Sequence, residues 1–136
     1  MNPIIRNILA FIAGFVLGSI VNVSLINIGP SIIPPPADAD ITTMEGLKAS
    51  MHLFKPINFL FPFLAHALGT LVGAWICALL AVGPKMKLAM GLGFFFLVAG
   101  IANVILLPSL LWYTIVDLVF AYIPMAYLGG KLAIKR

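Results

Sequence analysis

Four long apolar stretches follow one another along this chain, separated by short groups of polar residues. They extend over about residues 4–28, 57–82, 88–107 and 110–128. Each is close to the roughly 20 residues that an α-helix needs to cross a bilayer. The first is longer than the apolar core of a secretory signal, which is about 7–15 residues, so we expect it to be retained as a span. The pattern therefore predicts one all-α domain over residues 1–136, a bundle of four transmembrane helices.

The segment 29–56, between the first two stretches, has a different pattern. The run from Pro34 to Pro36 predicts a stiff, extended chain. The stretch from Thr42 to Glu45 has the Thr-x-x-Glu signature of a capping box, and apolar side chains then recur at helical spacing. We expect a short amphipathic helix over about 43–54 that lies on the membrane surface or caps the bundle. Its apolar stripe consists of Met44, Leu47, Met51 and Phe54.

Two of the apolar stretches share a short pattern that suggests an internal repeat. Residues 18–25 and residues 99–106 both contain Asn-Val-x-Leu after small residues. The other two stretches can be aligned by placing His66 opposite Asp117, although few identities support that half. One interpretation is a helical hairpin duplicated in tandem, whose copies are related by an axis along the membrane normal. The other is a chance likeness between apolar sequences.

Composition strengthens the assignment to a membrane. Of the 136 residues, 62% are hydrophobic and 9% are charged, against about 25% charged in a soluble domain. This excludes a soluble enzyme, a disordered chain and a secreted disulfide scaffold. The net charge of +4 does not indicate nucleic-acid binding, because the basic residues lie at the ends of the apolar stretches. The single cysteine, Cys77, allows no intramolecular disulfide.

The distribution of basic residues predicts the orientation. Most of them fall on one side of the predicted membrane, and by the positive-inside rule that side is cytoplasmic. Both termini are then inside, while segment 29–56 and the turn at Pro108 and Ser109 are outside. We expect Trp112 and Tyr113 in an outer aromatic belt, and Tyr122 and Tyr127 near the inner one. The basic residues on the cytoplasmic side are Arg6, Lys85, Lys87, Lys131, Lys135 and Arg136.

Four polar residues interrupt the apolar stretches at a similar depth: Asn22, His66, Asn103 and Asp117. At about 1.5 Å per residue they lie roughly 21–28 Å from the nearest cytoplasmic charge, in the outer half of a core about 30 Å thick. Polar side chains are costly in hydrocarbon and are therefore the first functional candidates in a membrane protein. We predict that they form one polar layer that binds a ligand or is coupled to protons, with His66 and Asp117 as a charge-assisted pair.

Small residues accompany these polar positions at helical spacing, which predicts close helix packing. The spacing Gly69-x-x-x-Gly73 is the clearest example. A second interpretation of the polar layer follows from this packing, in which the four polar groups only bond to one another and fix the helix register. The glycines expected at helix contacts are Gly14, Gly18, Gly69, Gly73 and Gly100.

The sequence offers little support for metal or catalytic chemistry. Glu45, His52 and His66 are candidate zinc ligands by type, but Glu45 and His52 are separated by about 10.5 Å along a helix, too far to bind one ion. Cys77 lies in the middle of an apolar stretch, where a thiol is a poor nucleophile. We therefore expect no metal, no cofactor and no catalytic residue.

Three stretches resemble segments of small uncharacterised bacterial inner-membrane proteins with four helices. They are residues 34–36, 47–54 and 61–70, in a resemblance that extends over half of the chain. The resemblance implies a bacterial inner membrane and brings no activity with it.

Three functions fit these patterns. The favoured one is binding or transport of a small solute through the polar layer. Because four helices enclose little volume, a complete path would need a homo-oligomer. The second is an accessory or assembly subunit that packs against another membrane protein. The third is a lipid-modifying membrane enzyme with His66 as base and Asp117 as its orienting group. The expected partners are membrane lipids and a second copy or another membrane protein, and nucleic acid is not among them.

Overall fold

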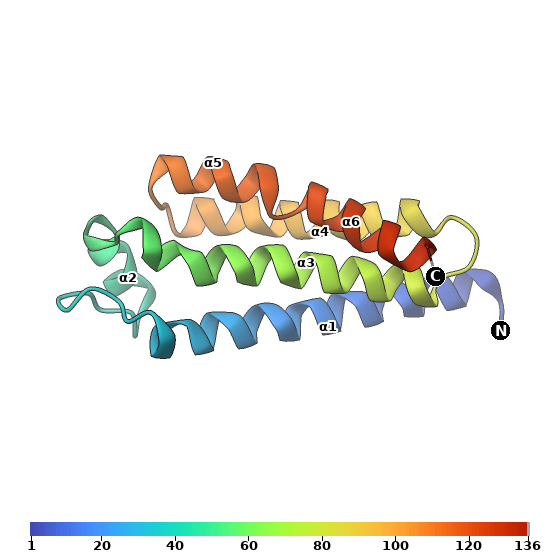
Figure 1. The fold of residues 1–136 in the computed structure, drawn as a ribbon, viewed down its shortest axis with the longest axis horizontal. Helices are drawn as coiled ribbons and strands as arrows, with labels where there is room; N and C mark the ends of the chain where they lie inside the picture. The colour runs from blue at the N-terminus through green and yellow to red at the C-terminus, as the bar shows by residue number, and fades with distance from the viewer. Residues whose placement is uncertain (136) are drawn as a thin grey trace.

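The computed structural model describes residues 1–135, which form an elongated helical bundle without strands in that range (Figure 1). Both termini lie at one end of the bundle, and α2 lies at the opposite end. The elements are α1 (Pro3–Ile32), α2 (Met44–Ser50), the 3₁₀-helices η1 (Met51–Leu53) and η2 (Pro56–Phe59), α3 (Leu60–Leu80), α4 (Lys85–Leu106), α5 (Leu111–Phe120) and α6 (Ile123–Ile134).

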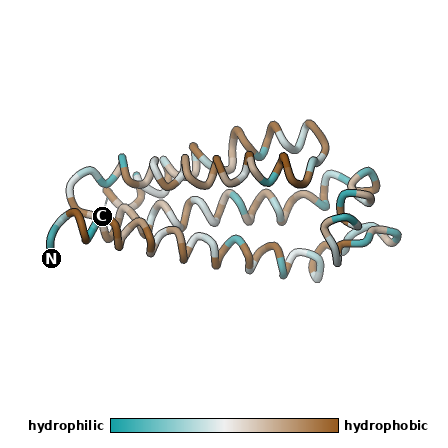
Figure 2. Tube along the Cα trace, turned by 180° about the vertical axis from the view of Figure 1, so that it is seen from behind, coloured by the Kyte–Doolittle hydropathy of each residue, from teal (hydrophilic) through white to brown (hydrophobic). Residues whose placement is uncertain are grey.

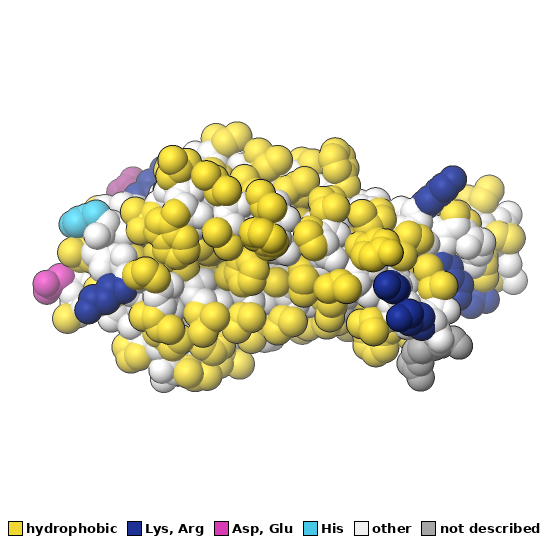
Figure 3. Space-filling view, turned by 45° about the horizontal axis from the view of Figure 1, so that its top comes forward, with side chains coloured by type: hydrophobic (Ala, Val, Ile, Leu, Met, Phe, Trp, Pro, Cys, Tyr) yellow, Lys and Arg dark blue, Asp and Glu magenta, His cyan; other side chains and the backbone are white. Residues whose placement is uncertain are grey.

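Four helical segments are long and apolar enough to cross a membrane, as the sequence predicts. They are Pro3–Ile32, Pro56–Leu80, Lys85–Leu106 and Leu111–Ile134. The hydropathy colouring in Figure 2 shows apolar chain along the bundle and a concentration of polar chain at the end that contains α2. A broad band of hydrophobic side chains covers the face shown in Figure 3, and most of its basic side chains lie at the end with the termini. The chain is therefore compatible with a polytopic membrane protein.

The half of the bundle near the termini, called here the inner half, is held together by close backbone contacts. A Cβ atom on Gly14 of α1 would lie 2.4 Å from the carbonyl oxygen of Gly73 on α3, and one on Gly69 would lie 2.9 Å from that of Gly18. Only glycine allows this approach. At the inner end of the contact between α1 and α3, Asn7 holds the chain just after α3. Its side-chain amide nitrogen donates to the carbonyl of Val82 at 3.0 Å, and its side-chain oxygen accepts from the Val82 N–H at 2.9 Å.

The fourth span is broken into α5 and α6, so the prediction of one continuous helix over residues 110–128 is wrong at this point. Pro124 lacks an N–H, and its ring conflicts with a helix that continues through it. The Ala121 N–H still donates to the carbonyl of Asp117 at 2.9 Å. The first bond of the next helix is the one that the Ala126 N–H donates to the carbonyl of Tyr122, at 2.8 Å. Ala121 and Tyr122 form the break, one turn after Asp117. The corresponding stretch of α3 is continuous, and the tandem duplication stays a prediction.

The outer segment contains a shorter helix than predicted. α2 ends at Ser50, and its N-terminus is capped by Thr43, whose hydroxyl oxygen accepts from the Gly46 N–H at 2.9 Å. The capping box that we expected from Thr42 is not formed, because the Thr42 hydroxyl donates to the carboxylate of Asp40 instead. Of the predicted apolar stripe, Met51 is buried against the bundle while Met44 is 51% exposed. That this segment lies on a membrane surface stays a prediction.

Candidate polar cavity in the outer half

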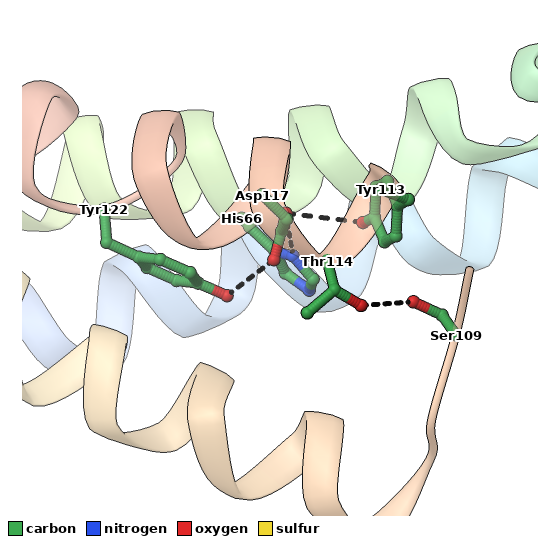
Figure 4. A network of polar contacts seen from close by, with 6 residues as sticks. All are labelled: His66, Ser109, Tyr113, Thr114, Asp117 and Tyr122. Atoms are coloured by element: carbon green, nitrogen blue, oxygen red, sulfur yellow. Dashed lines mark hydrogen bonds and ion pairs between the residues drawn. The ribbon is translucent and has the colours of Figure 1, made fainter. Parts of the chain in front are cut away.

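Asp117 is the centre of a buried hydrogen-bond cluster (Figure 4). It is 4% exposed, and its Oδ1 atom lies 2.8 Å from Nδ1 of His66. The hydroxyl of Tyr113 donates to Oδ1 and that of Tyr122 donates to Oδ2, each at 3.3 Å. A buried carboxylate is costly unless hydrogen-bond donors surround it. Since an ionised carboxylate only accepts hydrogen bonds, this geometry assigns the proton to Nδ1 of His66 when Asp117 is ionised.

Each member of the cluster is positioned by its own element. Tyr113 and Asp117 are four residues apart on α5, so they share one helical face. Tyr122 follows the end of α5, and the break in the helix turns its ring back toward Asp117. His66 reaches the cluster from α3, and its ring stacks on that of Tyr122 with centroids 5.8 Å apart. Gly100 on α4 makes room for the Tyr122 hydroxyl, since a Cβ atom there would lie 2.6 Å from that oxygen.

The two tyrosines are the residues that sequence reasoning missed. We expected Tyr113 and Tyr122 in aromatic belts at the membrane surfaces, but they are 8% and 4% exposed. The belt assignment of these two residues is therefore wrong. Two signals in the sequence pointed to the cluster: the four-residue spacing from Tyr113 to Asp117, and the proline that follows Tyr122 by two positions. The belt positions of Trp112 and Tyr127 stay predictions.

A cavity of about 870 Å³ lies beside this cluster, in the half of the bundle that contains α2 and α5, called here the outer half. All four residues of the predicted polar layer line it: Asn22 from α1, His66 from α3, Asn103 from α4 and Asp117 from α5. The structure thus brings the four to one cavity, although within residues 1–135 no hydrogen bond joins either asparagine to the histidine and aspartate pair. Asn103 is exposed, whereas the Oδ1 atom of Asn22 is buried and has no partner in the described chain.

The chemistry of the lining limits what the cavity can hold. Among the described residues that line it, Asp117 is the only acidic one, and none is a lysine or an arginine. The other polar groups are amides, hydroxyls and the His66 imidazole, which is 18% exposed and has its Nε2 atom left for another partner when Nδ1 contacts Asp117. Such a set suits a ligand that exchanges neutral hydrogen bonds, and it offers no cation to hold a phosphate.

The glycines predicted at helix contacts fall into two groups. Gly14, Gly18, Gly69 and Gly73 lie where α1 meets α3, and two of these, Gly18 and Gly69, also line the cavity. Gly100 lies at the cavity wall against Tyr122. The close glycine contacts between α1 and α3 therefore extend to the edge of the cavity, where the polar residues begin.

The fold and the site together define a class: a four-span helical bundle of membrane type with a buried aspartate, histidine and tyrosine cluster beside a cavity. Comparison of the chain with family models, with curated proteins and with solved structures gives no match. The geometry of the site is therefore the ground on which a function can be proposed.

Proposed function

We propose that this chain is a multi-pass membrane protein that binds a small solute in the cavity of its outer half. The observation that supports this most is the convergence of one polar residue from each of the four spans on a single cavity. Its volume, about 870 Å³, falls within the range of small-molecule sites, roughly 300–1,000 Å³. Polar groups placed in hydrocarbon at such a cost are expected to have a function.

Each polar residue has a distinct role in this proposal. Asp117 fixes the tautomer and orientation of His66, as a carboxylate does for a neighbouring imidazole. The Nε2 atom of His66 and the Oδ1 atom of Asn22 are then the groups that meet the ligand, because the described chain gives Asn22 Oδ1 no other partner. Asn103, which lines the cavity from α4, offers both a donor and an acceptor.

Transport is a second candidate function, and the break in the fourth span favours it. Discontinuous helices beside a midplane site are a common feature of transporters, and the break at Ala121 and Tyr122 directly follows Asp117. The inner half below the cavity is closed by the contacts of Gly14 with Gly73. A complete path would therefore require movement of α6 or the participation of a second copy.

The proposed location is a bacterial inner membrane with both termini in the cytoplasm. The sequence resemblance supports the membrane, and the basic side chains near the termini support the orientation. In intact cells expressing a Cys77→Ala background, an impermeant thiol reagent is expected to label Ala37→Cys and not Lys135→Cys. Labelling of Lys135→Cys from outside would reverse the orientation.

Ligand binding is tested by the thermal stability of the purified protein in detergent. A ligand that binds only the folded state raises the unfolding temperature by mass action. We expect uncharged hydrogen-bonding solutes to raise it for the wild type and for Ser24→Leu, a control on α1 that does not line the cavity. The shift should be lost in Asn22→Leu and His66→Leu. Equal shifts in all four proteins, or none in the wild type, would contradict the proposal, and stable co-purification with one membrane protein would support the accessory-subunit hypothesis instead.

A further inference from the structure

The outer end of the cavity is partly covered by apolar side chains of the outer segment and of η2. Leu47, Met51, Phe54 and Phe59 all line the cavity. Met51 and Phe59 are buried together with Tyr113, and Phe54 packs against them with its ring 5.7 Å from that of Phe59. These side chains form a packed hydrophobic layer over part of the outer end of the cavity.

The inner end of the cavity is closed by aromatic contacts between α1 and α4. The ring of Phe15 lies 5.4 Å from that of Phe95 and 5.8 Å from that of Phe96. Gly18, one turn further along α1, still faces Phe96, since a Cβ atom there would lie 3.3 Å from the Phe96 ring. Within residues 1–135, every aromatic pair between α1 and α4 belongs to this inner group.

Beyond these contacts, the cavity wall reaches the surface on both α1 and α4. Pro30 and Ile41, at the outer end, line the cavity and are exposed, and so are Ile26 and Asn27 on α1 and Ala99 and Asn103 on α4. Residues with both properties lie where a cavity reaches the surface, so besides an opening at the outer end there is a mouth between the outer halves of α1 and α4. At about 1.5 Å per residue, Ala99 is roughly 18 Å from Lys87, well inside a hydrocarbon core of about 30 Å. The mouth therefore faces lipid.

We propose that the ligand is an uncharged lipid with a hydroxyl head group, which enters from the bilayer between α1 and α4. This inference rests on the proposed function, because it names the ligand of the same cavity. The hydroxyl donates to Oδ1 of Asn22 or to Nε2 of His66 and accepts from the side-chain amide of Asn103, while the hydrocarbon chains stay at the mouth beside Ile26 and Ala99.

The lining excludes the other common lipid classes. A phosphate head would need a cation, and among the described lining residues there is no lysine or arginine, while the Asp117 carboxylate would repel it. An ammonium head would need a free carboxylate, but Asp117 is already in contact with His66 and with two tyrosine hydroxyls. The unpartnered group of the cavity is an acceptor, Asn22 Oδ1, and a hydroxyl donor satisfies it without bringing a charge into the cavity.

The test uses photoactivatable diacylglycerol and photoactivatable phosphatidic acid with the same chains, each in phosphatidylcholine vesicles containing the full-length protein. Unlabelled diacylglycerol serves as competitor. We expect competable labelling of peptides around Ile26 and Ala99 by the diacylglycerol probe, and at least tenfold weaker competable labelling by the phosphatidic acid probe. Ala99→Trp should block the mouth and reduce the labelling by at least fivefold. Its matched control is Val98→Trp, because Val98 is 50% exposed but does not line the cavity.

Ile26→Trp blocks the same mouth from α1 and replaces Ala99→Trp if that variant does not fold. Equal competable labelling by both probes, or full labelling after the mouth is blocked, would overturn the inference. If a water-soluble solute still stabilises the protein in an Asn22-dependent way, the proposed function survives that result. If the diacylglycerol labels Asn22→Leu and His66→Leu as strongly as the wild type, the head group does not lie at the polar residues and the lipid inference fails, while the solute test decides the proposed function separately.

Discussion

The inner and outer halves of this bundle are built from the same apolar helices, yet they pack in opposite ways. In the inner half, Gly14 and Gly73 bring two backbones into contact, and a cluster of buried alanines lies where α3, α4 and α6 meet. In the outer half, aromatic and polar side chains separate the helices around a cavity of about 870 Å³. Side-chain size at the contact positions, rather than overall hydrophobicity, decides which half is closed.

The polar side chains of the two halves also differ in their hydrogen bonding. At the inner end, the side chains of Arg6 and Asn7 bond to backbone carbonyls at the end of α3 and just after it, which are groups that a helix end leaves unpaired. In the outer half, Asp117 is surrounded by donors while Asn22 Oδ1 is left without a partner in the described chain. In the inner half, polar side chains thus satisfy backbone carbonyls. In the outer half, one side-chain acceptor is left for a ligand.

The largest expected effect comes from the buried pair of the outer half. Removing one member of a buried charged pair typically costs about 3–5 kcal/mol. Asp117→Leu should cost more than His66→Leu, because it also leaves the Tyr113 and Tyr122 hydroxyls without their acceptor. The double variant should be more stable than the sum of the two losses predicts. A double-mutant cycle measured by thermal unfolding in detergent gives this coupling.

An exposed carboxylate provides the control for this cycle. Asp38 lies in the outer segment and is exposed, so Asp38→Leu should change the free energy of unfolding by less than about 0.5 kcal/mol. Additive losses for His66→Leu and Asp117→Leu would mean that the two side chains do not interact. The outer half would then lack the polar cluster that distinguishes it from the inner half.

The next effect concerns the glycine contact of the inner half. A Cβ atom on Gly14 would lie 2.4 Å from the carbonyl oxygen of Gly73, so Gly14→Ala forces α1 away from α3. Overpacking of this kind costs about 1–3 kcal/mol. At Gly91, the nearest atom to an added Cβ is 3.9 Å away, on the Phe11 ring, and Gly91→Ala should gain up to about 1 kcal/mol from helix propensity. Thermal unfolding in detergent compares the two, and equal effects would contradict the close contact.

Hydropathy was enough to predict the four apolar spans. Hydropathy was not enough to predict how helices end, because that depends on tertiary contacts. Pro30 lies inside α1 and does not stop it, and Gly29 beside it packs directly on Phe61 of α3. Pro124 belongs to an equally apolar stretch, yet the helix breaks before it. The position of Tyr122 depends on that break, which explains why its place in the site could not be predicted from its depth.

A smaller effect is expected at the cap of α2, which belongs to the cover of the outer half. The hydroxyl oxygen of Thr43 accepts from the Gly46 N–H, and loss of such a cap typically costs about 1 kcal/mol. Thr43→Ala should increase hydrogen exchange of the α2 amides and leave the amides of α3 unchanged. Thr43→Ser keeps the accepting oxygen and should behave like the wild type. Faster exchange throughout the bundle would show that the cover and the inner half unfold as one unit.

The smallest expected effect is a pH dependence confined to the outer segment. The hydroxyl and the backbone N–H of Thr42 both donate to Asp40 and hold the pKa of its carboxyl below the usual value of 3.8. Because the pKa is lower in the folded chain, these bonds stabilise the segment above the unfolded pKa, and their contribution is lost as the pH falls through the folded pKa. The inner half has no acidic residue in its described part, so it should show no such dependence in this range.

An NMR titration of the Asp40 carboxyl carbon in detergent tests this prediction. Thr42→Val removes the side-chain donor and keeps the backbone N–H, so it should raise the pKa of Asp40 toward its usual value, whereas Thr42→Ser should not. Asp40 also covers Gly46, since a Cβ atom there would meet its carboxylate, and its N–H donates to Ser50 at 2.9 Å. Protonation of Asp40 should therefore speed hydrogen exchange in α2 before it affects α1 or α3. An unchanged pKa in Thr42→Val would mean that this turn is not formed in solution, and that the cover of the cavity is held by Met51 and its apolar neighbours alone.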